Sequence, residues 1–262
     1  MFRLIRIEKI MKISIITAVY NSENTIEDAI NSIKNQTYNN IEHIIIDGKS
    51  TDKSLLLIQQ CQHNGMRIFS EYDKGIYDAL NKGLSNASGD ILGFVHSDDF
   101  LANAEVIERI ASEFEDPTVE AVYSDLEYVA KTDTSRVVRR WSTGPFHLRR
   151  LKWGWMPAHP TLYVRRQVYE QFGNYDLSFE ISADYDFILR YFLRAKGKSV
   201  YIREVLYKMR VGGISNSKWS GIVKKMREDL HSIRKNRVGG LHTLIFKNLS
   251  KVGQFLVHSR RS

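Results

Sequence analysis

The stretch Gly89–Phe100 (Gly-Asp-Ile-Leu-Gly-Phe-Val-His-Ser-Asp-Asp-Phe) decides how this chain folds. Its apolar part, residues 91–95, has the length and composition of a buried strand. The run ends in Asp98 and Asp99, and two adjacent carboxylates at a buried strand end repel each other and lose solvation. A divalent cation would offset both costs, because Mg²⁺ and Mn²⁺ prefer oxygen ligands. The alternative is a polar turn in which an aspartate caps the next helix.

Strands and helices alternate on both sides of this stretch. Strands are predicted at residues 13–19, 41–46, 66–70, 91–95 and 119–123, with amphipathic helices between most of them. This alternation is typical of an α/β fold with a mostly parallel sheet flanked by helices. Further on, residues 126–130 and 136–141 predict a hairpin, and residues 166–172 and 183–195 predict helices.

Composition limits the class of protein. The single cysteine, Cys61, excludes an intramolecular disulfide and suits a reducing cytoplasm, and its apolar helical surroundings predict a core position. Residues 1–10 are too short and too charged for a signal peptide, so residues 1–11 are interpreted as an extension. The sequence has no apolar run of the ~20 residues that a membrane span requires. We therefore expect a cytoplasmic protein.

The positive charge is concentrated at the C-terminus. Of the net charge of +8, residues 218–262 contribute +9 and residues 1–217 contribute −1. A neutral body argues against nucleic-acid binding, and a basic tail favours contact with an anionic surface. We therefore divide the chain into a body at residues 12–217 and a basic, amphipathic helical tail at residues 218–262.

The tail predicts helices near residues 219–235 and 241–258. Seven apolar residues of the second helix share one face of it: Leu241, Leu244, Ile245, Leu249, Val252, Phe255 and Leu256. A basic helix of this kind can lie on anionic lipid, at the inner face of the plasma membrane. Packing on the body, or on a second subunit in a homodimer, is the alternative.

Carboxylates gather at one predicted edge of the sheet. Asp47 and the pair Asp98-Asp99 end strands, and Asp73 follows the third strand closely. Ligands of open α/β sheets bind at this edge. The turn at residues 20–24 has no glycine-rich phosphate loop, so a metal would have to hold the phosphates of a nucleotide. Asp184, near a helix start, could act as a general base, or could simply complement the helix dipole.

Taken together, these segments resemble glycosyltransferase family 2, inverting enzymes with the GT-A fold that bind nucleotide-diphospho-sugars. The resemblance is carried, in family order, by residues 15–21, 36–52, 71–83 and 89–99, and covers about residues 12–215. It implies transfer of a sugar from a nucleotide-diphospho-sugar donor to a glycan or lipid-linked glycan, with Mn²⁺ or Mg²⁺ as cofactor, in bacterial polysaccharide assembly.

The resemblance also implies roles for single residues. Asp99 would bind the cation, and Asp184 would be the base that acts on the acceptor hydroxyl. The residue before Asp184 is Ala183 where the family has glutamate, so a second acceptor-side carboxylate is lost unless Asp186 replaces it. The remaining donor contacts would come from Thr17, Val19, Tyr20, Asp47, Asp73, Lys82 and Asp98.

Three further features have two interpretations each. His159 is expected either to contact the acceptor or the leaving group or to be structural. Trp153 and Trp155 are expected either to stack on an acceptor sugar or to be buried aromatic anchors. The glycine-rich loop at residues 212–215 folds over the diphosphate, or is an ordinary turn. A sugar nucleotidyltransferase and a non-catalytic nucleotide-sugar-binding or anionic-surface-binding module are the alternative functions.

Overall fold

The structure is a computed structural model that describes residues 10–212 and 219–256. Side chains are described within these ranges except at residues 219–220 and 251–256. Most of the expected extension at residues 1–11, and residues 213–215 of the glycine-rich loop, lie outside the described residues.

The first half of the chain forms a parallel sheet. β1 (Ile13–Val19) pairs with β2 (Ile41–Asp47) on one side and with β4 (Ile91–Phe94) on the other, and β3 (Met66–Ser70) extends the sheet beyond β2. The connecting helices are α1 (Ile26–Lys34), α2 (Ser54–Gln60) and α3 (Ile76–Asn86). The chain leaves β1 toward β2 and later returns to its other side as β4, which creates the reversal of strand order where α/β sheets bind ligands.

The second half adds antiparallel strands to the same sheet. β8 (Tyr163–Arg165) lies antiparallel to β4 and to β6 (Val119–Val129), and β9 (Lys198–Arg210) runs parallel to β6. β5 (Phe100–Leu101) pairs with β9, and β7 (Val137–Trp141) forms the predicted hairpin with β6. The mixed α/β sheet is thus confirmed. Residues 119–129 form one long strand, which corrects the prediction of two shorter ones.

Alternating side chains divide the core between the two faces of the sheet. Ile15 and Ile45 pack with α1, α2 and α4 (Val106–Glu113) on one face. Ile16 and Ile44 pack on the other face, with α3, α6 (Arg166–Phe172) and α7 (Ala183–Phe192). A methyl group at Gly83 of α3 would lie 2.3 Å from the Ile16 side chain, so glycine lets α3 approach β1 closely.

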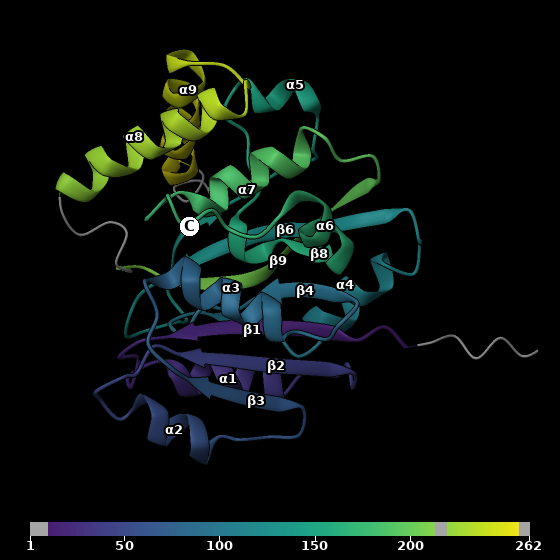
Figure 1. The fold of residues 1–262 in the computed structure, drawn as a ribbon, viewed down its shortest axis with the longest axis vertical. Helices are drawn as coiled ribbons and strands as arrows, with labels where there is room; N and C mark the ends of the chain where they lie inside the picture. The colour runs from purple at the N-terminus through teal and green to yellow at the C-terminus, as the bar shows by residue number, and fades with distance from the viewer. Residues whose placement is uncertain (1–9, 213–218, 257–262) are drawn as a thin grey trace, which may run out of the picture.

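The C-terminal helices α8 (Trp219–Lys235) and α9 (Leu241–Leu256) stack on α7 at one end of the molecule (Figure 1). Ile233, Val238 and Leu244 join the core of the body. The buried Asp229 of α8 pairs with the buried Lys247 of α9, whose Nζ lies 2.7 Å from its carboxylate. Burial opposes ionisation of Asp229, but the neighbouring charges of Lys247 and Lys225 prevail and lower its pKa. The tail therefore packs on the body, as one of the alternatives expected.

Two sequence-based expectations differ from the structure. Leu244 points into the core, whereas Leu241, Ile245 and Leu249 are exposed, so these residues do not act as one face. The side chains of Val252, Phe255 and Leu256 lie outside those described. Cys61, just after α2, is only half-buried: it packs against the outside of the core and its Sγ lies 3.7 Å from Glu27 Oε1. None of the described helices is long and apolar enough to span a bilayer.

A buried carboxylate ties the strands together at the edge opposite the predicted site. Glu42 of β2 accepts hydrogen bonds from the Ser14 hydroxyl (2.6 Å) and the Ser88 amide (2.7 Å). Lys12 and Arg67 each place a nitrogen 3.2 Å from its Oε1. Burial opposes ionisation, but the hydrogen bonds from Ser14, Ser88 and Lys12 prevail and lower the pKa of Glu42 to about 2.

We expect Glu42→Gln to lower the free energy of unfolding at pH 7 by about 1–3 kcal/mol, because charge-assisted hydrogen bonds are lost. The depressed pKa means that the ionised form stabilises the fold above about pH 4.5 and that this stability is lost between about pH 4.5 and 2. Urea unfolding across this range should therefore show a shallower pH dependence in the variant. Glu105→Gln, at an exposed site, is the control, and equal slopes in Glu42→Gln and the wild type would refute the assignment.

Candidate active site

The turns that follow β1, β2 and β4 are bonded to one another at the carboxyl ends of the strands. The Asn21 side chain accepts a hydrogen bond from the Thr51 amide (2.8 Å), and the Ser22 and Ser97 hydroxyls lie 2.9 Å apart. Asn21 and Lys49 hold positive φ angles of 48° and 62°, which non-glycine residues rarely adopt. Such strain persists only where the surroundings impose it, and it is typical of functional sites.

Three of the predicted donor residues meet around Gly48. Asp47 is fully buried and accepts hydrogen bonds from the Ser50 amide (3.1 Å) and the Ser70 hydroxyl (2.6 Å). A methyl group at Gly48 would lie 2.3 Å from the Asp73 carboxylate and 3.5 Å from the Tyr20 ring. The absence of a side chain at Gly48 therefore lets Asp73 and Tyr20 close over the end of β2.

Other predicted donor residues have structural partners. The side chains of Thr17 and Val19 are buried, and the Thr17 hydroxyl lies 3.0 Å from His43 Nε2, which leaves only main chain for a ligand. Lys82 of α3 donates to the Tyr72 carbonyl (2.5 Å) and lies 3.6 Å from Asp78. This lysine holds α3 against the segment that carries Asp73.

The two adjacent aspartates have different environments. Asp99 is 1% exposed and accepts hydrogen bonds from the Arg210 amide (3.0 Å) and the Tyr207 hydroxyl (3.2 Å), both on β9. Burial and the neighbouring Asp98 raise the pKa of Asp99. Asp98 is half-buried, and within the described residues its carboxylate has no hydrogen bond or ion pair. Asp98 is thus the more accessible of the two.

Asp184 lies in the first turn of α7. Its Oδ1 is 3.0 Å from the hydroxyl of Tyr77 on α3, and that hydroxyl is 2.7 Å from the Ile181 carbonyl. Burial lowers the pKa of His96, while Asp98 and Asp184 both oppose that shift. The His96 ring centre lies 6.0 Å from that of His159, whose Nε2 lies 2.7 Å from the Tyr175 hydroxyl, and the Tyr175 ring centre lies 5.5 Å from that of Tyr77. These contacts connect the end of β4, which carries Asp98, to the Tyr77 hydroxyl beside Asp184.

His159 and Trp155 have structural partners. His159 Nε2 lies 2.7 Å from the Tyr175 hydroxyl, its ring stacks on Phe94, and burial lowers its pKa to about 4. Trp155 is 8% exposed, donates to the Thr143 carbonyl (3.0 Å) and packs against Phe192. Trp155 thus has the buried position that was the alternative to stacking on an acceptor sugar.

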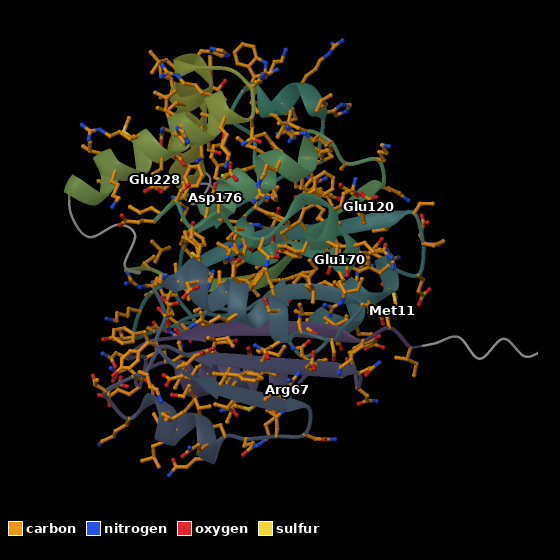
Figure 2. The ribbon with its side chains drawn as sticks, viewed as in Figure 1. Met11, Arg67, Glu120, Glu170, Asp176 and Glu228 are labelled. Atoms are coloured by element: carbon orange, nitrogen blue, oxygen red, sulfur yellow. The ribbon has the colours of Figure 1, made fainter. Side chains whose placement is uncertain are left out.

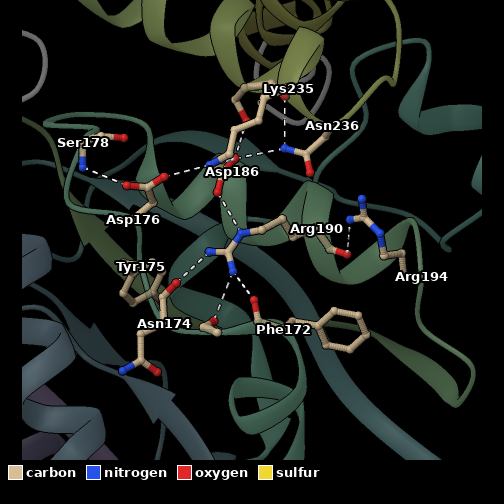
Figure 3. Close-up of polar contacts among 12 residues, drawn as sticks. Phe172, Asn174, Tyr175, Asp176, Ser178, Asp186, Arg190, Arg194, Lys235 and Asn236 are labelled. Carbon is tan, nitrogen blue, oxygen red and sulfur yellow. Dashed lines mark hydrogen bonds and ion pairs between the residues drawn. The ribbon is translucent and has the colours of Figure 1, made fainter.

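The start of α7 is fixed from two sides. Glu228 of α8, labelled in Figure 2, accepts hydrogen bonds from the amides of Ile181 (2.8 Å) and Ser182 (3.0 Å). Figure 3 shows fully buried Asp186 bonded to Arg190 (2.8 Å) and Asn236 (2.9 Å). Asp186 is thus occupied by protein partners and cannot replace the missing acceptor-side carboxylate.

Sequence reasoning missed several residues that build the site. Tyr77 lies inside the motif at residues 71–83, and His96 directly precedes Ser97-Asp98-Asp99, so both had a local signal. Glu228 and Tyr207 had none, because they reach the site only through the packing of α8 and β9.

The described side chains do not form a complete metal cage. No group of three or more His, Cys, Asp and Glu residues among them could hold an ion. A hollow lined by Asp28, Asn31, Gln36, Phe100 and Arg210, among others, contains none of the predicted site residues.

Comparison with known sequences identifies the family. A model described as glycosyl transferase family 2 matches residues 14–172. An uncharacterised glycosyltransferase of Mycobacterium tuberculosis is 32% identical over 226 residues, which is 84% of each chain. A PGL/p-HBAD biosynthesis glycosyltransferase of Mycobacterium bovis is 32% identical over 209 residues, covering 78% of this chain and 79% of that protein.

Solved structures share the fold. TarS 1–349 of S. aureus in complex with UDP-GlcNAc aligns over 85% of this chain and 66% of its own, with a TM-score of 0.69 and 19% identity. The mannosyltransferase PcManGT from Pyrobaculum calidifontis, in complex with GDP-Man and Mn²⁺, aligns over 89% of this chain and 66% of its own, with a TM-score of 0.66 and 16% identity. This chain thus spans about two thirds of those structures. The family match and the shared architecture establish that the chain is a GT-A fold glycosyltransferase of family 2.

Proposed function

We propose that this enzyme transfers a sugar from a nucleotide-diphospho-sugar to a sugar hydroxyl, with inversion, and that Asp184 is the general base. The observation that supports the proposal is the set of contacts through Tyr77, Tyr175 and His159 that connects Asp184 to His96, two residues before Asp98. The donor would lie along the ends of β1, β2 and β4, with its base near Asp47 and Asp73. Localisation in the cytoplasm, and an acceptor that is a glycan or lipid-linked glycan, are parts of the same proposal.

In the proposed reaction, Asp184 removes the proton of the acceptor hydroxyl as its oxygen attacks the anomeric carbon. The new glycosidic C–O bond forms while the bond from the anomeric carbon to the diphosphate breaks. The proton stays on Asp184, and the electron pair leaves with the nucleoside diphosphate. Tyr77, bonded to the same carboxylate, orients it toward the acceptor.

The residues at the end of β4 fit a divalent cation, Mn²⁺ or Mg²⁺. The Asp98 carboxylate is accessible and has no partner among the described residues, and a donor diphosphate would complete its ligands. A cation held there would stabilise the charge that develops on the leaving diphosphate. Direct binding by Asp99 stays a prediction, and the burial of this residue favours Asp98 as the closer ligand with Asp99 as its anchor.

Asp184→Asn should reduce kcat by about 10²–10⁴-fold, because the amide cannot accept the acceptor proton. The affinity for the donor should stay unchanged, since Asp184 acts on the acceptor. Turnover with a donor–acceptor pair and calorimetric donor titration measure the two effects. Asp116→Asn, at a 41% exposed aspartate in the turn before β6, at the opposite edge of the sheet, is the matched control. Retained turnover would refute the role of Asp184, and a wild type without turnover or donor hydrolysis would favour the non-catalytic binding module.

Asp98→Asn should abolish the Mn²⁺-dependent part of nucleoside-diphosphate binding and leave the Tm of the free protein unchanged. Asp99→Asn should also lower the Tm of the free protein, because Tyr207 and the Arg210 amide lose a buried partner. Thermal shifts with UDP, GDP, dTDP and CMP, each with and without Mn²⁺, measure both effects and identify the base of the donor. If nucleoside-diphosphate binding still depends on Mn²⁺ in Asp98→Asn but no longer does so in Asp99→Asn, then Asp99 rather than Asp98 binds the cation.

Tyr77→Phe should lower kcat about 2- to 10-fold with little change in the donor KM, because one hydrogen bond that orients the base is lost. Tyr72→Phe removes the same atom from an 82% exposed tyrosine of the preceding loop and serves as the control. A purely structural role would instead change the donor KM and the Tm of the free protein together.

A further inference from the structure

The outward side of α9 is apolar although no described element covers it. Leu241, Ile245 and Leu249 recur every four residues, and each is more than half exposed. Phe246, beside them on the helix, is 41% exposed. The opposite side of α9 holds Leu244 and Lys247 in the core, so the helix is anchored and cannot rotate to hide these residues.

A second segment continues this apolar surface. Trp153, just after α5 (Leu148–Leu151), is 58% exposed, and the centre of its ring lies 4.7 Å from that of Phe246. The Thr243 hydroxyl donates to the Lys152 carbonyl (2.9 Å), which fixes the segment against α9. Figure 1 shows α5 and α9 at the same end of the molecule. We name the set Leu148, Trp153, Leu241, Ile245, Phe246 and Leu249 the α5–α9 surface.

The basic residues beside this surface are not balanced by acidic residues from the same segments. The segments that carry the surface, residues 141–153 and 238–250, contain no Asp or Glu. Arg149, Arg150 and Lys152 are exposed beside Trp153. An apolar patch with an aromatic residue and a basic surround matches the boundary of a bilayer that carries anionic headgroups.

We propose that the α5–α9 surface binds the face of an anionic lipid bilayer, with its apolar side chains in the headgroup region and its basic residues on the lipid phosphates. Two copies of this surface would bring like charges together, which disfavours a dimer as its occupant. The proposal goes beyond the transferase reaction and does not depend on it.

Flotation of the full chain with vesicles tests this surface. Vesicles of phosphatidylcholine with 30 mol% phosphatidylglycerol should carry the protein to the top of the gradient, and pure phosphatidylcholine vesicles should carry much less. Ile245→Ser with Leu249→Ser should lower the partition coefficient at least about tenfold, because two apolar contacts are lost. Arg149→Gln with Lys152→Gln should lower it by about fivefold for each charge and reduce its salt dependence.

Leu56→Ser is the matched control, because Leu56 is 52% exposed on α2 at the other end of the molecule (Figure 1). It should float like the wild type, and so should Asp184→Asn, which separates this proposal from the proposed reaction. Failure of the wild type to float, or equal loss in Leu56→Ser, would overturn the proposal. A dimer in light scattering that Ile245→Ser with Leu249→Ser dissociates would also overturn it and assign the surface to a second copy.

Discussion

A buried carboxylate must find partners, and the partners of Asp99 join the two halves of this molecule. At the end of β4 it accepts hydrogen bonds from the Tyr207 hydroxyl and the Arg210 amide, both on β9. Leaving such a group unpaired would cost several kcal/mol, so β9 is held against the end of β4. The Arg210 guanidinium also donates a hydrogen bond to the Asp98 carbonyl (2.7 Å), so both aspartates of this turn are bonded to β9. The accessible Asp98 carboxylate therefore has a rigid support.

The same principle fixes the start of α7, where Asp184 lies. The Glu228 carboxylate accepts hydrogen bonds from the main-chain amides that precede the helix, a position where anionic groups are stabilising. Buried Asp186 is paired with Arg190 inside the helix and with Asn236 beyond α8. Tyr77 contacts Asp184 from α3, on the donor side. Elements from the first half of the chain and from its C-terminal helices thus position one carboxylate.

These contacts change how the C-terminal helices are understood. Their charge suggested an appendage, yet Ile233, Val238 and Leu244 belong to the core of the body, and α8 supplies Glu228. Lys247 shows why the apolar periodicity of α9 did not predict which side of that helix is buried. A lysine is normally a surface residue, but here it is 1% exposed because Asp229 lies 2.7 Å away and the Tyr185 ring lies 3.4 Å from its ammonium. The apolar residues on the other side of α9 are left outside.

The sequence by itself determined the α/β class, the parallel strands and the polar residues at their ends, because apolar runs and turn residues are local signals. The order of the motifs also identified the family, with Asp47, Asp73, Asp98, Asp99 and Asp184 as its candidate residues. Only the tertiary structure decided which of these residues are accessible. Asp99 and Trp155 are buried and Asp98 is not, since burial depends on which distant segments pack against each strand end. Tyr207 and Glu228 entered the site for the same reason, because their partners are far away in the chain and no local pattern predicts them.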